Sequence, residues 1–178
     1  MPASYHFITN WVLEGTTCDD VYAILHDADS LPQWWPSVYL SVRRDDDGNI
    51  LLWTKGWLPY TLQWAFRVTV EDPPHRLGLS ANGDFVGEGM WTIAADEAHP
   101  ANVKVTYDWR IEAAKPLLRR LSWLLRPVFS ANHHWAMRVG LTSLKLELAR
   151  RRATTDAERA AIAAPPPPTF RWLLPRRG

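Results

Sequence analysis

His133 is the side chain of this sequence best suited to acid–base chemistry. The chain holds six histidines, and the imidazole has an ordinary pKa of about 6.5, which suits proton transfer near neutral pH. His133 and His134 are neighbours, and neighbours on a helix point about 100° apart, so the two cannot reach one ligand together. His133 falls on an apolar helical stripe. It is therefore either a hydrogen-bonded core histidine or the acid–base group of an internal site.

Tyrosine hydroxyls could add hydrogen bonds to a site of this kind. Tyr107 and Tyr60 can each donate a hydrogen bond to a ligand carbonyl. Asp108 and Arg110 alternate with Tyr107 along one predicted strand, so their side chains fall on its other face. We expect these two charges to lie at the protein surface.

The motifs of metal and nucleotide chemistry are missing from the sequence. It has no HExxH or CxxC spacing and no nucleophile elbow. Its one glycine-rich run, GDFVGEG at residues 83–89, breaks the dinucleotide-binding spacing. We therefore expect no metal and no nucleotide cofactor. The net charge of +1 argues against a nucleic-acid partner.

Cysteine content and hydropathy bear on the compartment. Cys18 is the single cysteine, which excludes an internal disulfide framework and fits a reducing environment. The N-terminal MPASYHFITN lacks the basic and apolar regions of a signal peptide. No stretch reaches the ~20 apolar residues of a membrane span. The sequence predicts a cytoplasmic protein.

Alternating polar and apolar residues predict a sheet with a dry face and a wet face. Short connections between the later strands favour an antiparallel meander. Two short helices follow the first strand, one capped by Thr17 and one at about residues 29–34. A long helix at about 128–152 would cover the dry face, with a separate helix at about 116–125 because Pro127 interrupts the helical pattern. The predicted strands are residues 5–13, 38–45, 50–55, 62–70, 76–82, 85–95 and 102–113.

Aromatic side chains gather on the dry face. The sequence has 11 tryptophans, more than packing alone requires. Trp34 and Trp35 lie between two prolines on a connection, where one ring would line and the other cap the mouth of a pocket. The alternative is a solid core, since interiors are close-packed. We expect a cavity because ligand pockets favour aromatic walls. The rings of dry parity are Trp11, Trp64, Phe66, Trp91, Tyr107 and Trp109.

This order of elements resembles the START-like superfamily, specifically its polyketide cyclase/dehydrase and lipid-transport branch. The resemblance implies an α+β helix-grip fold, in which a curved antiparallel sheet of about seven strands wraps around a long C-terminal helix. The helix-grip domain would occupy residues 1–152, and residues 153–178 would form an extended Ala/Pro-rich spacer and a basic-aromatic tail. The segments that carry the resemblance are WWP (34–36), GWLPY (56–60), NGDFVGEGMW (82–91), YDW (107–109) and NHHWAM (132–137).

The resemblance implies that the protein binds a hydrophobic small molecule, such as a lipid, a polyketide or an aromatic compound, in an internal cavity. The alternative is a polyketide cyclase, aromatase or dehydratase that uses the same cavity without a metal or nucleotide cofactor. His133 and Tyr107 would then be the catalytic residues. The expected ligand-binding residues are Trp34, Trp35, Trp57, Tyr60, Trp64, Phe66, Phe85, Trp91, Tyr107, Trp109, His133 and Met137.

Two basic and apolar segments raise a third hypothesis, weak contact with a membrane surface. Residues 115–129 read KPLLRRLSWLLRPVF, and the C-terminal residues 170–178 read FRWLLPRRG. Segments of this composition can lie at a lipid interface. The alternative is that both pack against the domain.

Overall fold

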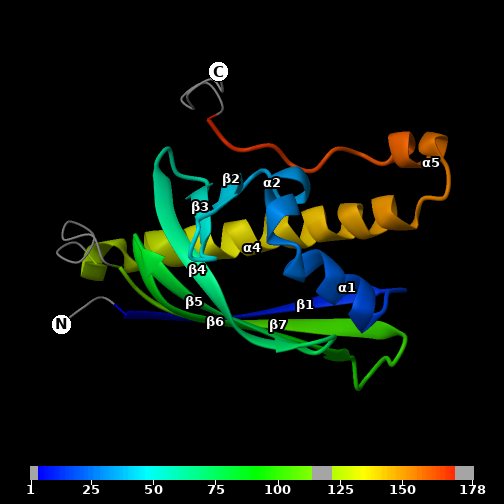
Figure 1. Cartoon of the computed structure of the whole chain (residues 1–178), viewed down its shortest axis with the longest axis horizontal. Helices are drawn as coiled ribbons and strands as arrows, with labels where there is room; N and C mark the ends of the chain where they lie inside the picture. The colour runs from blue at the N-terminus through cyan, green and yellow to red at the C-terminus, as the bar shows by residue number, and fades with distance from the viewer. Residues whose placement is uncertain (1–3, 114–121, 171–178) are drawn as a thin grey trace.

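The computed structural model describes residues 4–113 and 122–170. Its described strands form one antiparallel sheet in the order β1-β7-β6-β5-β4-β3-β2. Figure 1 shows the sheet curving around the long helix α4. The predicted α+β helix-grip fold is confirmed. The strands are β1 (Ser4–Glu14), β2 (Tyr39–Arg44), β3 (Ile50–Lys55), β4 (Thr61–Asp72), β5 (Arg76–Gly83), β6 (Phe85–Ala95) and β7 (Asn102–Ala113).

The segment between β1 and β2 folds into three short helices, α1 (Cys18–His26), η1 (Ala28–Ser30) and α2 (Leu31–Trp34). Thr17 caps α1 as predicted, because its hydroxyl accepts the Asp20 N–H while the Asp20 carboxylate accepts the Thr17 N–H. Pro32 stands in the first turn of α2, where its missing N–H has no helical partner to lose. The segment thus carries the tryptophan pair to the sheet.

The long helix α4 (Ser122–Arg152) begins earlier than the sequence predicts. The predicted break at Pro127 is wrong, because Pro127 lies inside the continuous helix. A proline removes one backbone hydrogen bond, and the other bonds of a 31-residue helix tolerate that loss. Residues 116–121 of the separate helix predicted at 116–125 lie outside the described residues. Residues 122–125 belong to α4.

The inward side chains of the strands and the apolar stripe of α4 pack together in one core between the sheet and α4. The inward positions of β7 are all buried, as their alternation with polar residues predicts. Met137, Leu144 and Leu148 of the α4 stripe are buried as well. Pairing with β1 sets the inward residues of the two strands side by side, with Phe7 opposite Trp109 and Thr9 opposite Tyr107.

The chain beyond α4 differs from the extended spacer that the sequence predicts. Residues 156–161 form the helix α5 (Asp156–Ala161), which Thr155 and Glu158 cap reciprocally. The segment then runs back to the sheet (Figure 1), where Thr169 contacts Lys55 at the end of β3. Alanine and charged residues favour a helix once such a capping box starts it. The prolines that follow made the whole segment resemble an extended spacer.

Candidate ligand cavity

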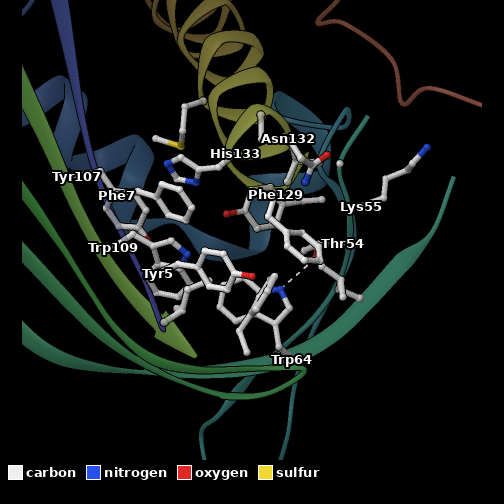
Figure 2. Close-up of a pocket in the computed structure, with 18 of the residues that line it drawn as sticks. Tyr5, Phe7, Thr54, Lys55, Trp64, Tyr107, Trp109, Phe129, Asn132 and His133 are labelled. Atoms are coloured by element: carbon white, nitrogen blue, oxygen red, sulfur yellow. Dashed lines mark hydrogen bonds between the residues drawn. The ribbon is translucent and has the colours of Figure 1, made fainter. Parts of the chain in front are cut away.

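A cavity of about 130 Å³ lies between the concave face of the sheet and α4. Figure 2 shows side chains of α4, among them Asn132 and His133, facing rings of the sheet across this space. Its lining is mostly aromatic and aliphatic. Neither a carboxylate nor a guanidinium belongs to the lining among the described residues. The predicted cavity is therefore present, although it is small.

The inner end of the cavity is closed by Trp35. Its indole is only 3% exposed and lies against Gly140 of α4, because a Cβ on that glycine would be 2.2 Å from indole Cζ2. The ring also contacts Trp11 at a centroid distance of 6.0 Å and Tyr39 at 5.2 Å. Trp35 is thus a fixed wall that depends on a glycine in the facing helix.

The outer end of the cavity is less buried. Phe129 of α4 meets Tyr5 of β1 edge to face, with ring centroids 5.7 Å apart. Tyr60 and Phe85, which line the same end from the β3–β4 loop and β6, are half-buried. The cavity therefore approaches solvent near the start of α4.

His133 lies on the α4 side of the cavity. Its imidazole stacks on Phe7 with centroids 4.1 Å apart and an interplanar angle of 13°, and its Nε2 is 3.3 Å from the Thr9 hydroxyl oxygen. Burial, and secondarily the neighbouring His134, lower the pKa of His133 to about 4. The imidazole is therefore neutral near pH 7.

Tyr107 lies in a stack of rings along the floor of the cavity. It is parallel to Trp91 at a centroid distance of 4.0 Å and to Trp109 at 5.6 Å. A Cβ on Gly89 would be 2.7 Å from the Tyr107 hydroxyl oxygen, so this glycine makes room for the phenol. Burial, with a smaller contribution from Tyr39, holds the pKa of Tyr107 well above its ordinary value of 10. The hydroxyl keeps its proton.

Thr54 and Trp64 form a polar contact in the opposite wall (Figure 2). The Trp64 indole N–H donates to the Thr54 hydroxyl oxygen over 3.0 Å. The hydroxyl has one hydrogen of its own, which this bond does not use. Thr54 thus offers a donor in a wall that is otherwise apolar.

Lys55 is the charged residue of the lining, and its ammonium is held outside the cavity. Figure 2 shows the side chain directed away from the rings. The ammonium donates to the carbonyl oxygen and to the hydroxyl oxygen of Thr169, the latter over 2.9 Å, and lies 5.4 Å from the Phe170 ring centroid. Burial lowers its pKa. The C-terminal segment therefore satisfies a lysine that is 3% exposed.

Eight of the twelve residues predicted to bind the ligand line the cavity, and four do not. Trp34 is buried in the core, where it and Phe66 and Trp91 border a smaller void of about 50 Å³ beyond the inner end. Trp57 is 38% exposed on the outer surface. The predicted lid of Trp34 and Trp35 at an open mouth is wrong, because both indoles are buried at the closed end. The predicted residues that line the cavity are Trp35, Tyr60, Trp64, Phe85, Tyr107, Trp109, His133 and Met137.

Sequence reasoning missed several lining residues, some of which carried a usable signal. Tyr5 and Phe7 share the dry parity of β1 with Trp11. Asn132 precedes His133, and its amide oxygen accepts the Trp57 N–H over 2.9 Å. Lys55 has no such signal, because its partner Thr169 is 114 residues away in the chain. The other missed residues are Val38, Tyr39, Thr54, Gly56, Leu62, Ile111, Phe129 and Ala136.

The membrane hypothesis concerns segments that the structure covers in part. Residues 115–121 and 171–178 lie outside the described residues. Within the described ones, none of the helices is both long enough and apolar enough to cross a bilayer.

Arg110 and Asp108, expected at the surface, form an exposed ion pair with an Nε–Oδ1 distance of 3.1 Å.

Known proteins share this fold at low sequence identity. TTHA0849 from Thermus thermophilus superposes with a TM-score of 0.69 and 15% identity, over 84% of this chain and all of that one. The Zhui aromatase/cyclase from Streptomyces sp. R1128 superposes with a TM-score of 0.62 and 15% identity, over 85% of this chain and 97% of that one. The di-domain aromatase/cyclase BexL of the BE-7585A biosynthetic pathway superposes with a TM-score of 0.59 and 14% identity, over 80% of this chain and 49% of that protein.

A search of curated proteins finds no match to the sequence. The family described as polyketide cyclase/dehydrase and lipid transport matches residues 16–137. That range runs from the start of α1 to the middle of α4, and includes the cavity walls formed by β3, β4, β6 and β7. The chain therefore belongs to the polyketide cyclase/dehydrase and lipid transport family.

Proposed function

We propose that this protein binds a neutral, hydrophobic small molecule in the cavity between α4 and the sheet. The observation that carries the proposal is the composition of the cavity wall. Its rings give apolar contact area, its charged residue Lys55 donates to Thr169, and its histidine is uncharged near pH 7. A charged ligand would lose its hydration without gaining a counter-ion.

The size of the cavity favours a compact ligand. A cavity of about 150 Å³ lined by apolar side chains accepts benzene, and this one measures about 130 Å³. A single aromatic ring therefore fits. A lipid chain or a fused polyketide would require side chains such as Phe129 and Tyr60 to move.

A polyketide cyclase or aromatase is the second candidate, favoured by the family and by the two aromatase/cyclases of the same fold. His133 and Tyr107 would be its acid–base residues. However, an imidazole with a pKa of about 4 is a weak base, and near pH 7 it is not the imidazolium that a general acid requires. Tyr107 retains its proton, and its raised pKa makes it a weak acid. The geometry supports binding better than proton transfer.

Native mass spectrometry of the full chain, purified from its source organism, tests the proposal. We expect a copurified neutral compound whose mass disappears after denaturation. Incubation of the purified protein with a short aromatic polyketone tests the second candidate. Cyclisation that His133→Gln abolishes, while binding of the polyketone persists, would replace the binding proposal with the enzyme.

A further inference from the structure

Four aromatic residues separate the cavity from the smaller void beyond its inner end. Trp35, Tyr39, Trp64 and Tyr107 line both spaces. Trp35 and Tyr39 are in edge contact, and Tyr39 is near enough to Tyr107 to raise the pKa of that phenol. The four rings therefore lie together at the inner end.

This region is rich in hydrogen-bond donors that have no acceptor. The Trp35 indole N–H is buried without a partner. Within residues 4–113 and 122–170, the Tyr39 and Tyr107 hydroxyls make no hydrogen bond, and neither residue has an interaction beyond those described. The Thr54 hydroxyl accepts from Trp64 and keeps its own hydrogen. A buried donor left unpaired costs about 1–3 kcal/mol, and the Trp35 N–H is such a donor. The Tyr39 and Tyr107 hydroxyls are further donors that a ligand oxygen can use.

The chemistry of these groups specifies that acceptor. An indole N–H can only donate, and a phenol hydroxyl that keeps its proton donates readily to a neutral oxygen. Among the described residues the lining contains no carboxylate, and the amide oxygen of Asn132 already accepts the Trp57 N–H. A ketone or aldehyde oxygen has two lone pairs and no hydrogen, and it can accept from two of these donors at once.

We propose that the inner end of the cavity is a carbonyl-binding site that selects neutral aryl ketones, aldehydes or quinones. The ligand enters with its carbonyl oxygen toward Tyr39 and Tyr107, and its apolar body lies toward Phe7 and Met137. This inference rests on the proposed binding function. It names the ligand class by its acceptor oxygen, because a hydrocarbon of equal shape would leave the donors unpaired.

Two probes of nearly equal shape test the inference by calorimetry. Acetophenone has a carbonyl oxygen where α-methylstyrene has a methylene group. We expect Tyr39→Phe and Tyr107→Phe each to weaken acetophenone binding about threefold to tenfold, the effect of one neutral hydrogen bond. The same variants should leave the affinity for α-methylstyrene unchanged. Tyr22→Phe, which alters a phenol of α1 outside the cavity, is the matched control for both probes.

The outcomes separate this inference from the binding proposal. If neither probe binds the unaltered protein, the proposed function fails. If both bind and the phenylalanine variants change both affinities equally or change neither, the carbonyl site is overturned while binding stands.

Infrared spectroscopy of ¹³C-carbonyl acetophenone bound to the unaltered protein needs no variant. We expect a stretching frequency lower than that in hexane, because donated hydrogen bonds weaken the C=O bond. The frequency should return toward the hexane value in the double variant Tyr39→Phe/Tyr107→Phe. A hexane-like frequency in the unaltered protein would contradict the inference even if both variants failed to fold.

Discussion

The indole of Trp35 occupies the space that a side chain at Gly140 would need. A Cβ on Gly140 would lie 2.2 Å from Cζ2 and 2.6 Å from Cε2 of that ring. A glycine inside a helix costs about 1 kcal/mol relative to alanine. The close approach of the ring to the helix backbone offsets that cost, and it fixes the inner wall of the cavity.

Replacing this glycine should therefore destabilise the protein although alanine is the better helix former. We expect Gly140→Ala to lower the free energy of unfolding by about 1–3 kcal/mol, the usual cost of overpacking. Trp35→Phe removes the part of the ring that collides. In that background Gly140→Ala should be neutral or stabilising, and a denaturant double-mutant cycle measures the difference. Additive effects would show that the two residues do not share the space.

The positions of the rings explain how far the sequence could predict this site. Period-two alternation places Tyr107 and Trp109 on the dry face, and the helical stripe places His133 and Met137 opposite them. Parity does not say where along a strand the cavity ends. Trp91 and Phe66 have the correct parity and still border the smaller void beyond the inner end.

Irregular backbone and distant contacts were harder to predict. Trp34 and Trp35 are on a segment without a fixed side-chain period, so the pattern could not show that both indoles turn inward. The prolines correctly indicated a connection, but α2 packs that connection into the core instead of leaving it at an opening. The contact of Lys55 with Thr169 depends on the chain returning after α5, which no local pattern records.

The neutral state of His133 should appear as an acid sensitivity of the fold. The unfolded chain binds a proton at this residue below its ordinary pKa of 6.5, whereas the folded protein binds it only below about 4. Acid therefore favours the unfolded state between these values, by at most about 1.4 kcal/mol per pH unit.

Urea titrations of the unaltered protein and of His133→Gln measure this contribution. Above pH 6.5 the free energies of unfolding of the two proteins should change with pH in parallel. As the pH falls from 6.5 to 4, that of the unaltered protein should decrease more steeply. The carboxylates whose pKa values are lowered, such as Asp108, act in both proteins and cancel in the comparison. Parallel curves through the whole range would mean that His133 has the same pKa in the folded and the unfolded state.

The contact of the C-terminal segment should contribute measurably to stability. Thr169 accepts from Lys55, and its hydroxyl lies 3.1 Å from the Trp57 carbonyl oxygen. We expect Thr169→Val, which keeps the shape of the side chain, to lower the free energy of unfolding by about 0.5–1.5 kcal/mol. Thr142→Val is the control, because that exposed hydroxyl only bonds back to Arg138 of its own helix. Equal effects of the two changes would refute a stabilising contact.

A cavity and a solid core respond in opposite ways to added volume. Ala136 of α4 lines the cavity, and Ala131 is exposed on another face of the same helix. In a cavity the leucine of Ala136→Leu would occupy existing space, so the free energy of unfolding should stay the same or rise by about 0.5–2 kcal/mol. In a close-packed core the same change should cost about 1–3 kcal/mol. We expect the first result, together with a more than tenfold loss of acetophenone affinity and no loss in Ala131→Leu. The opposite result would be a destabilised Ala136→Leu that still binds acetophenone. The larger side chain would then have met other side chains instead of empty volume, and the ligand would lie elsewhere.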